Sequence, residues 1–120
     1  MALNVFEVAL YAMILSGGQA PLTCERHEAA TPVVKCSNGA VATEDEEGRI
    51  RYMDGTTVYK GQNGALSFSN GISSHWGSAG WVQFTNNVSV RRTGNNNFKS
   101  NGGLTCRPLS DDRATCDKAG

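Results

Sequence analysis

A sixteen-residue period through the middle of the chain restricts what the protein can fold into. Blocks of that length open at Pro32, Gly48, Gly64 and Gly80, and a fifth block from Asn96 fits if one residue is dropped. Turn-forming pairs recur at matching places in the blocks: Asn38-Gly39, Asp54-Gly55, Asn70-Gly71, Asn86-Asn87 and Asn101-Gly102. Two residues before each of the first four pairs stands a large apolar residue or a cysteine: Cys36, Tyr52, Phe68 and Phe84.

Each block predicts one β-hairpin. Apolar and polar residues alternate before each turn pair, as in a half-buried strand, and Asn-Gly accepts the positive φ angles of hairpin turns. A three-residue loop would pair Phe68 with Ile72 on one face. The sequence therefore predicts a mainly β fold. We expect an antiparallel meander of eight to ten short strands between about Val33 and Leu104, forming a sandwich or a barrel. A β-solenoid with one coil per block is the alternative.

The chain has four cysteines, which favour two disulfides and an oxidising compartment. We therefore expect a secreted, periplasmic or cell-surface protein. Local pairing is the simplest of the three connectivities and would staple both ends of the repeat array, through Cys24–Cys36 and Cys106–Cys116. A Cys36–Cys106 bond would instead bring the first and last strands together in a closed barrel.

The N-terminal residues 2–15 are apolar except for Asn4 and Glu7. They are too few to span a bilayer. A secretory signal and a packed helix are both compatible with this segment. A packed helix of this composition would be buried on more than one face.

The sequence of residues 3–15, LNVFEVALYAMIL, resembles the N-terminal helix of type IV pilins and type II secretion pseudopilins. The resemblance covers about an eighth of the chain. Members of that family begin with an apolar helix that carries a glutamate at its fifth position, which Glu7 would be if Met1-Ala2 were the leader. The resemblance implies that this helix packs in a filament core and that the glutamate sets the register between subunits. The residues it makes candidates for assembly are Phe6, Glu7, Leu10 and Ile14.

Charge and motif content argue against several functions. Eleven basic and eleven acidic side chains balance, so no long-range field attracts nucleic acid, and any membrane contact is expected only through residues 2–15. The chain contains no recognisable catalytic, phosphate-binding or haem-attachment motif. The spacing of Cys24 and His27 is compatible with zinc but lacks a second ligand pair. We expect no enzyme, cofactor or metal site.

Aromatic residues near one loop are the best ligand-binding candidates: Tyr59, His75, Trp76 and Trp81. They could form a platform for a glycan or a peptide. Alternatively, and as the favoured interpretation, the two tryptophans are core residues that plug the end of the sheet.

These patterns divide the chain into an N-terminal helix or signal-like segment (1–16), a linker (17–31), a β-repeat domain (32–111) and a disulfide-tied tail (112–120). The predicted function is that of a non-catalytic extracytoplasmic structural or assembly subunit, for which a pilin-like filament is one form. We expect it to associate with itself or with another extracytoplasmic protein. The alternative is a small secreted module that binds a carbohydrate or a protein. Deleting residues 2–15 would leave the β domain folded if the helix served assembly.

Overall fold

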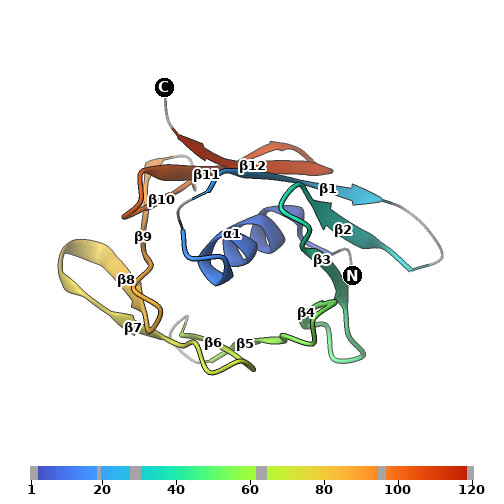
Figure 1. Cartoon of the computed structure of the whole chain (residues 1–120), viewed down its shortest axis with the longest axis horizontal. Coiled ribbons are helices and arrows are strands. Elements are labelled where there is room, and N and C mark those ends of the chain that lie inside the picture. The colour runs from blue at the N-terminus through green and yellow to red at the C-terminus, as the bar shows by residue number, and fades with distance from the viewer. Residues whose placement is uncertain (1–2, 19, 28–30, 62–64, 95–96, 119–120) are drawn as a thin grey trace.

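The computed structural model describes residues 3–18, 20–27, 31–61, 65–94 and 97–118. It is a mainly β protein in which the strands surround one N-terminal helix (Figure 1). The helix α1 spans Val5–Leu15, and a short 3-10 turn, η2, spans Ser78–Gly80. The strands are β1 (Leu22–His27), β2 (Val33–Cys36), β3 (Val41–Glu44), β4 (Ile50–Tyr52), β5 (Val58–Lys60), β6 (Leu66–Phe68), β7 (Ser74–Trp76), β8 (Trp81–Phe84), β9 (Ser89–Arg92), β10 (Phe98–Ser100), β11 (Leu104–Ser110) and β12 (Arg113–Lys118).

The strands follow one another in chain order and close on themselves. Ten form one antiparallel sheet in the order β4-β3-β2-β1-β12-β11-β10-β9-β8-β7, and β5 pairs with β6. Single bridges between Arg51 and Thr57 and between Ser67 and Ser73 connect that pair to β4 and β7. The predicted meander is confirmed, and of the two predicted forms it takes the barrel, with α1 inside (Figure 1).

The hairpins use the three-residue loop. The Phe68 backbone N–H donates to the Ile72 carbonyl at 2.8 Å, and the Gly71 N–H donates to the Phe68 carbonyl at 3.0 Å. Gly71 has a φ angle of 97°, which is the left-handed conformation that completes this turn. This pairing is that of a hairpin and not of a solenoid coil.

The recurring Asn or Asp of the first four blocks shapes its own turn. The side-chain oxygen of Asn38 accepts the backbone N–H of Ala40 at 3.1 Å, and that of Asp54 accepts Thr56 N–H at 2.9 Å. Asn70 and Asn86 make the same contact two residues onward, at 3.2 and 3.3 Å. These residues therefore stabilise the turn locally.

A second column of the repeat ties neighbouring turns together. The backbone N–H of Ser69 donates to the Thr57 carbonyl at 3.0 Å, and the Thr57 N–H donates back to Ser69 Oγ at 2.8 Å. The next turn repeats the reciprocal pair between Thr85 and Ser73, at 3.0 and 3.2 Å. We call the equivalent positions of the five turns the turn ladder: Ser37, Met53, Ser69, Thr85 and Asn101.

The fifth block keeps the sixteen-residue period without any dropped residue, so the expected one-residue shift is wrong. The Gly103 backbone N–H donates to the Ser100 carbonyl at 3.2 Å, as the Asn87 N–H donates to Phe84. Ser100 therefore occupies the place of the large apolar residue. The helix end approaches closely there, because a Cβ built on Gly102 would lie 2.3 Å from the Gly18 carbonyl oxygen.

Two segments expected to lie outside the β domain are strands. The expected linker contains β1, and the expected tail contains β12. These two strands pair with each other, with Leu22 opposite Cys116, and their pairing closes the barrel. Their polar, charged sequences hid them, because only alternate residues such as Leu22 and Cys24 face the interior.

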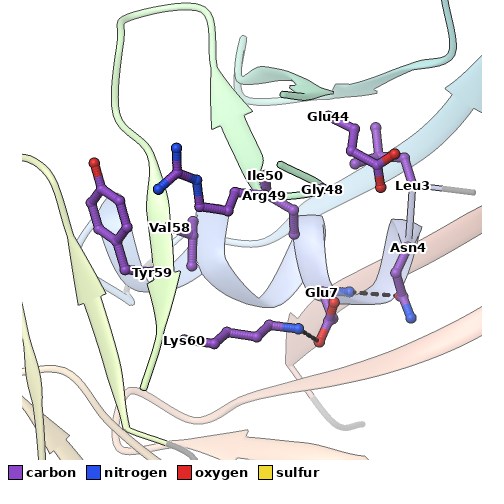
Figure 2. A pocket seen from close by; sticks show the side chains of 10 residues that line it. All are labelled: Leu3, Asn4, Glu7, Glu44, Gly48, Arg49, Ile50, Val58, Tyr59 and Lys60. Carbon is purple, nitrogen blue, oxygen red and sulfur yellow. Dashed lines mark hydrogen bonds and ion pairs between the residues drawn. The ribbon is translucent and has the colours of Figure 1, made fainter. Parts of the chain in front are cut away.

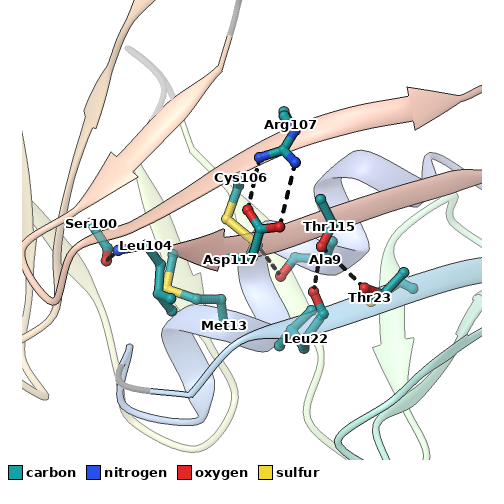
Figure 3. The surroundings of a disulfide bond; sticks show 12 residues. Ala9, Met13, Leu22, Thr23, Ser100, Leu104, Cys106, Arg107, Thr115 and Asp117 are labelled. Carbon is teal, nitrogen blue, oxygen red and sulfur yellow. Dashed lines mark hydrogen bonds and ion pairs between the residues drawn. A yellow bond between two sulfur atoms is a disulfide. The ribbon is translucent and has the colours of Figure 1, made fainter. Parts of the chain in front are cut away.

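Both disulfides join neighbouring strands, as the local-pairing prediction required. Cys24 is bonded to Cys36 across β1 and β2, and Cys106 is bonded to Cys116 across β11 and β12 (Figure 3). The two bridges flank the closing seam from either side, so closure needs no Cys36–Cys106 bond. The disulfides indicate an oxidising, extracytoplasmic environment.

The helix is the core of the barrel, which confirms the expectation of burial on more than one face. Asn4 caps its first turn by accepting the Glu7 backbone N–H at 3.0 Å. It packs against β12, β1, β11 and β2, and Ala9 and Met13 face the Cys106–Cys116 disulfide (Figure 3). From the opposite direction, the Tyr52 hydroxyl donates to the Val8 carbonyl at 2.8 Å. In the described part of the chain, no helix has the length and apolar character needed to cross a membrane.

We predict that Gly102→Ala destabilises the fold by about 2–3 kcal/mol, because its Cβ would overlap the Gly18 backbone. Gly94→Ala is the matched control, since its Cβ would meet no atom within 4 Å, and it should change the free energy of unfolding by less than about 0.5 kcal/mol. Chemical denaturation of both variants measures the difference. Equal stability of the two variants would contradict the close approach of the helix end.

Met53 is the one member of the turn ladder whose side chain has no oxygen atom. At the other four positions, a side-chain oxygen accepts a backbone N–H. The Met53 backbone N–H still donates to the Val41 carbonyl, at 2.9 Å. We predict that Met53→Ser stabilises the protein by about 0.5–1 kcal/mol by accepting the Val41 N–H. Met53→Ala should give no such gain in stability. Thermal unfolding measures both variants, and equal melting temperatures would show that the side-chain hydrogen bonds of the turn ladder do not stabilise the protein.

Candidate functional site

The helix lies off the centre of the barrel and leaves a cavity on its far side. The cavity has a volume of about 520 Å³ and lies between α1 and the wall formed by β6 to β10. We call it the helix–wall cavity. Most of its lining is apolar, from Leu10, Tyr11, Ile14, Leu66, Trp76, Val82, Phe84, Val90 and Phe98. Its volume is in the range of small-molecule sites in proteins.

The position of the helix explains the space. On one side, Ala9 allows a close approach to the seam, and the Cys116 Sγ lies 3.6 Å from the Ala9 carbonyl oxygen. On the other side, aromatic rings bridge part of the gap. The Tyr11 ring packs edge-on against Phe68 with centroids 6.0 Å apart, and Phe68 lies 6.1 Å from Phe84. The remaining volume is the cavity.

One end of the helix–wall cavity is closed. The side-chain amide of Asn86 donates to the Ile14 carbonyl at 2.8 Å and so joins the turn ladder end of the barrel to the end of the helix. Val88 is buried beside it, against Gly18. The deepest lining side chains, those of Ile14, Phe84 and Val90, are almost fully buried.

The other end carries the charged groups. Lys60 Nζ lies 2.6 Å from the Glu7 carboxylate, which also accepts the Tyr11 hydroxyl at 3.4 Å. Burial, and then the negative charge of Glu7, raise the pKa of Tyr11 well above its usual value, so this phenol stays protonated as a donor. Arg92 lines the same end.

A second cavity of about 510 Å³ lies on the other side of the Glu7–Lys60 ion pair (Figure 2). Its rim holds Tyr59, whose ring lies 5.0 Å below the Arg49 guanidinium. Arg49 also pairs with Asp45 at 2.9 Å. Its backbone N–H bond to Asp45, aided by this pair, holds the pKa of Asp45 below its usual range. Arg49 also pairs with Glu47 at 2.8 Å, so it engages two acidic side chains of the turn that precedes it.

The four aromatic-loop candidates do not form one platform. Trp76 lines the helix–wall cavity, whereas Tyr59 lines the second cavity. Trp81 precedes the cavity-lining Val82 in β8, so strand alternation turns it to the outer face. His75 also lies outward and contacts the Gln83 side chain at 3.1 Å.

The expectation of a core tryptophan is wrong for Trp76. Its side chain is 66% exposed, because it stands at the open end of the barrel beside the η2 turn. The role of the four candidates in ligand binding stays a prediction.

The four assembly candidates contact the barrel within this one chain. Phe6 packs against Phe98 with centroids 6.0 Å apart, and Glu7 pairs with Lys60. Leu10 and Ile14 are buried, and both line the helix–wall cavity. Filament formation through these residues would therefore compete with their packing inside the barrel.

Sequence reasoning missed Lys60 and Arg92 as site residues. A signal was available, since each follows an inward-facing valine by two residues, Val58 and Val90, and a period of two places both members on one face. A cation at the end of an otherwise apolar, inward-facing side of a strand is expected near the rim of the barrel, where its charge can stay in water. Among the described residues, no group of three or more His, Cys, Asp or Glu could hold a metal ion.

We predict that Trp76→Ala lowers the free energy of unfolding by less than about 1 kcal/mol, because most of the indole is already in solvent. Phe84→Ala, on the same cavity wall but buried, should cost about 3–5 kcal/mol. Denaturation curves of the two variants test this ranking. A loss at Trp76 as large as that at Phe84 would restore the core assignment.

Comparison of the chain with protein-family models, with curated proteins and with solved structures finds no match.

Proposed function

We propose that the protein is a non-catalytic, secreted or periplasmic binding protein that holds a small apolar or amphiphilic molecule in the helix–wall cavity. The observation that carries the proposal is the cavity itself, about 520 Å³ in volume, lined mainly by apolar side chains and entered beside Trp76. Regular elements, α1 and the strands, supply most of the lining. A site built on such elements needs little reorganisation when a ligand enters.

The lining favours an apolar body over a sugar. A bound glycan would bury hydroxyl groups that need hydrogen-bond partners, and burying them unpaired is costly. The deep wall offers only hydrocarbon and aromatic surface, from Ile14, Phe84 and Val90. An apolar group loses nothing in that environment and gains the free energy of leaving water.

A non-catalytic role fits the charged groups at the entrance. Glu7 is engaged by both Lys60 and Tyr11, and the described lining brings no histidine, cysteine or serine next to that carboxylate. Such an arrangement can orient a ligand, but it lacks the acid, base and nucleophile set of a typical active site.

Assembly into a pilin-like filament is the competing proposal. It needs the apolar face of α1 to leave the barrel, and nothing in the barrel would replace it as a core. Deleting residues 2–15 separates the two proposals. A folded, non-associating β domain would support assembly, whereas loss of the near-ultraviolet circular dichroism signal would support the helix as a wall of the binding site.

The direct test is titration with N-phenyl-1-naphthylamine, a neutral apolar probe that fluoresces when it leaves water. We expect saturable binding of one probe per chain. Val82→Trp, which directs an indole into the cavity from β8, should weaken the affinity at least about tenfold.

Gln83→Trp is the matched control, because the next residue of β8 is exposed on the outer face. It should leave the affinity for the probe unchanged. Absence of saturable binding to the wild-type chain, or equal weakening by both variants, would overturn the proposed function.

A further inference from the structure

The helix–wall cavity is polar at one end only. Strand β9 runs from the turn ladder end toward the entrance, with Val90 deep in the cavity and Arg92 at its mouth. Strand β5 runs the same way and ends at Lys60. Glu7 meets Lys60 from the first turn of the helix. A ligand that matches this gradient has an apolar part for the closed end and a polar group for the mouth.

The charges at the mouth also have a sign. The lining contains two cations, Lys60 and Arg92, and one carboxylate, Glu7. Two cations against one carboxylate give the described lining a net positive formal charge. An anionic head group would reduce this positive charge, whereas a cationic head group would increase it.

The aromatic side chain at the mouth fits the same orientation. Trp76 is 66% exposed and lies on the cavity side of β7. An indole has an apolar face and a polar N–H, and this makes it suited to the boundary between a buried apolar group and water. Trp81, on the outer face, has no such position relative to the cavity.

We propose that the ligand is an amphiphile with an anionic head group, whose apolar body enters toward Ile14, Phe84 and Val90 and whose head group is held at the mouth by Arg92 and Lys60. This inference rests on the proposed function and specifies its ligand class. It gives Arg92 the role of a specificity-determining residue, while the apolar wall supplies the affinity common to all ligands.

The test compares two amphiphiles that have the same alkyl chain and opposite head groups. Dodecanoate and dodecyltrimethylammonium, both below their micelle concentrations, compete with bound N-phenyl-1-naphthylamine. We expect dodecanoate to displace the probe at a concentration about tenfold lower, because charge-assisted hydrogen bonds to Arg92 act on it alone. This preference should shrink as the salt concentration rises, since the mouth is open to solvent.

Two single-charge variants locate the effect. Arg92→Gln should remove most of the preference for dodecanoate, and Arg91→Gln should retain it, because Arg91 changes the net charge equally but pairs with Trp81 on the outer face. Arg91→Gln should also leave the affinity for the neutral probe unchanged.

The outcomes for the two proposals are distinguishable. Probe binding without any preference between the two amphiphiles, or with the same loss in both arginine variants, overturns the anionic head group and leaves the binding function standing. Failure of the neutral probe to bind overturns both. A preference for dodecyltrimethylammonium would contradict the sign of the charge at the mouth.

Discussion

The close contact between α1 and the closing seam of the barrel determines most of what the structure can do. An eight-stranded barrel is narrow enough for its own side chains to fill it, and a ring of twelve strands is wider. The helix supplies the missing core, but it packs against β12, β1, β11 and β2 and not along the axis. Small residues and the disulfides allow this approach on one side, and the space left on the other side is the helix–wall cavity.

Short strands make such a wide ring depend on its turns. Several strands have only three residues, and pairs that short contribute few ladder hydrogen bonds. The turn ladder adds side-chain hydrogen bonds to these turns, and the Asn or Asp of the first four turns holds the local shape of its own turn. Two features thus recur every sixteen residues. One is a turn that closes its own hairpin, and the other is a hydrogen-bonded contact that joins this turn to the neighbouring segment. Asn86 adds a third contact by reaching the helix end.

The repeat could be recognised in the sequence because the interactions that define it are local. Turn chemistry and strand alternation lie within a few residues, so the meander, the loop type and the neighbour pairing of cysteines could be predicted. Closure through Leu22 and Cys116 could not, since no local pattern couples residues so far apart. The interior position of Leu10 and Ile14 was equally hidden, because an apolar helix has the same sequence whether it packs inside a barrel or in a filament. Lys60 and Arg92 became site residues only when the strands brought them to one mouth.

The neighbour pairing of the strands has a consequence for how the chain reaches its native state. Every strand contact except one joins segments adjacent in sequence, and both disulfides close loops of short separation, 12 and 10 residues. Hairpins can therefore form and oxidise early and independently, as expected for contacts of low loop-closure entropy. The pairing of β1 with β12 is the slow, non-local event, and it requires the helix to be inside already. The helix is synthesised before β12 and is enclosed only when that strand pairs with β1, so its apolar residues stay exposed to solvent until the barrel closes.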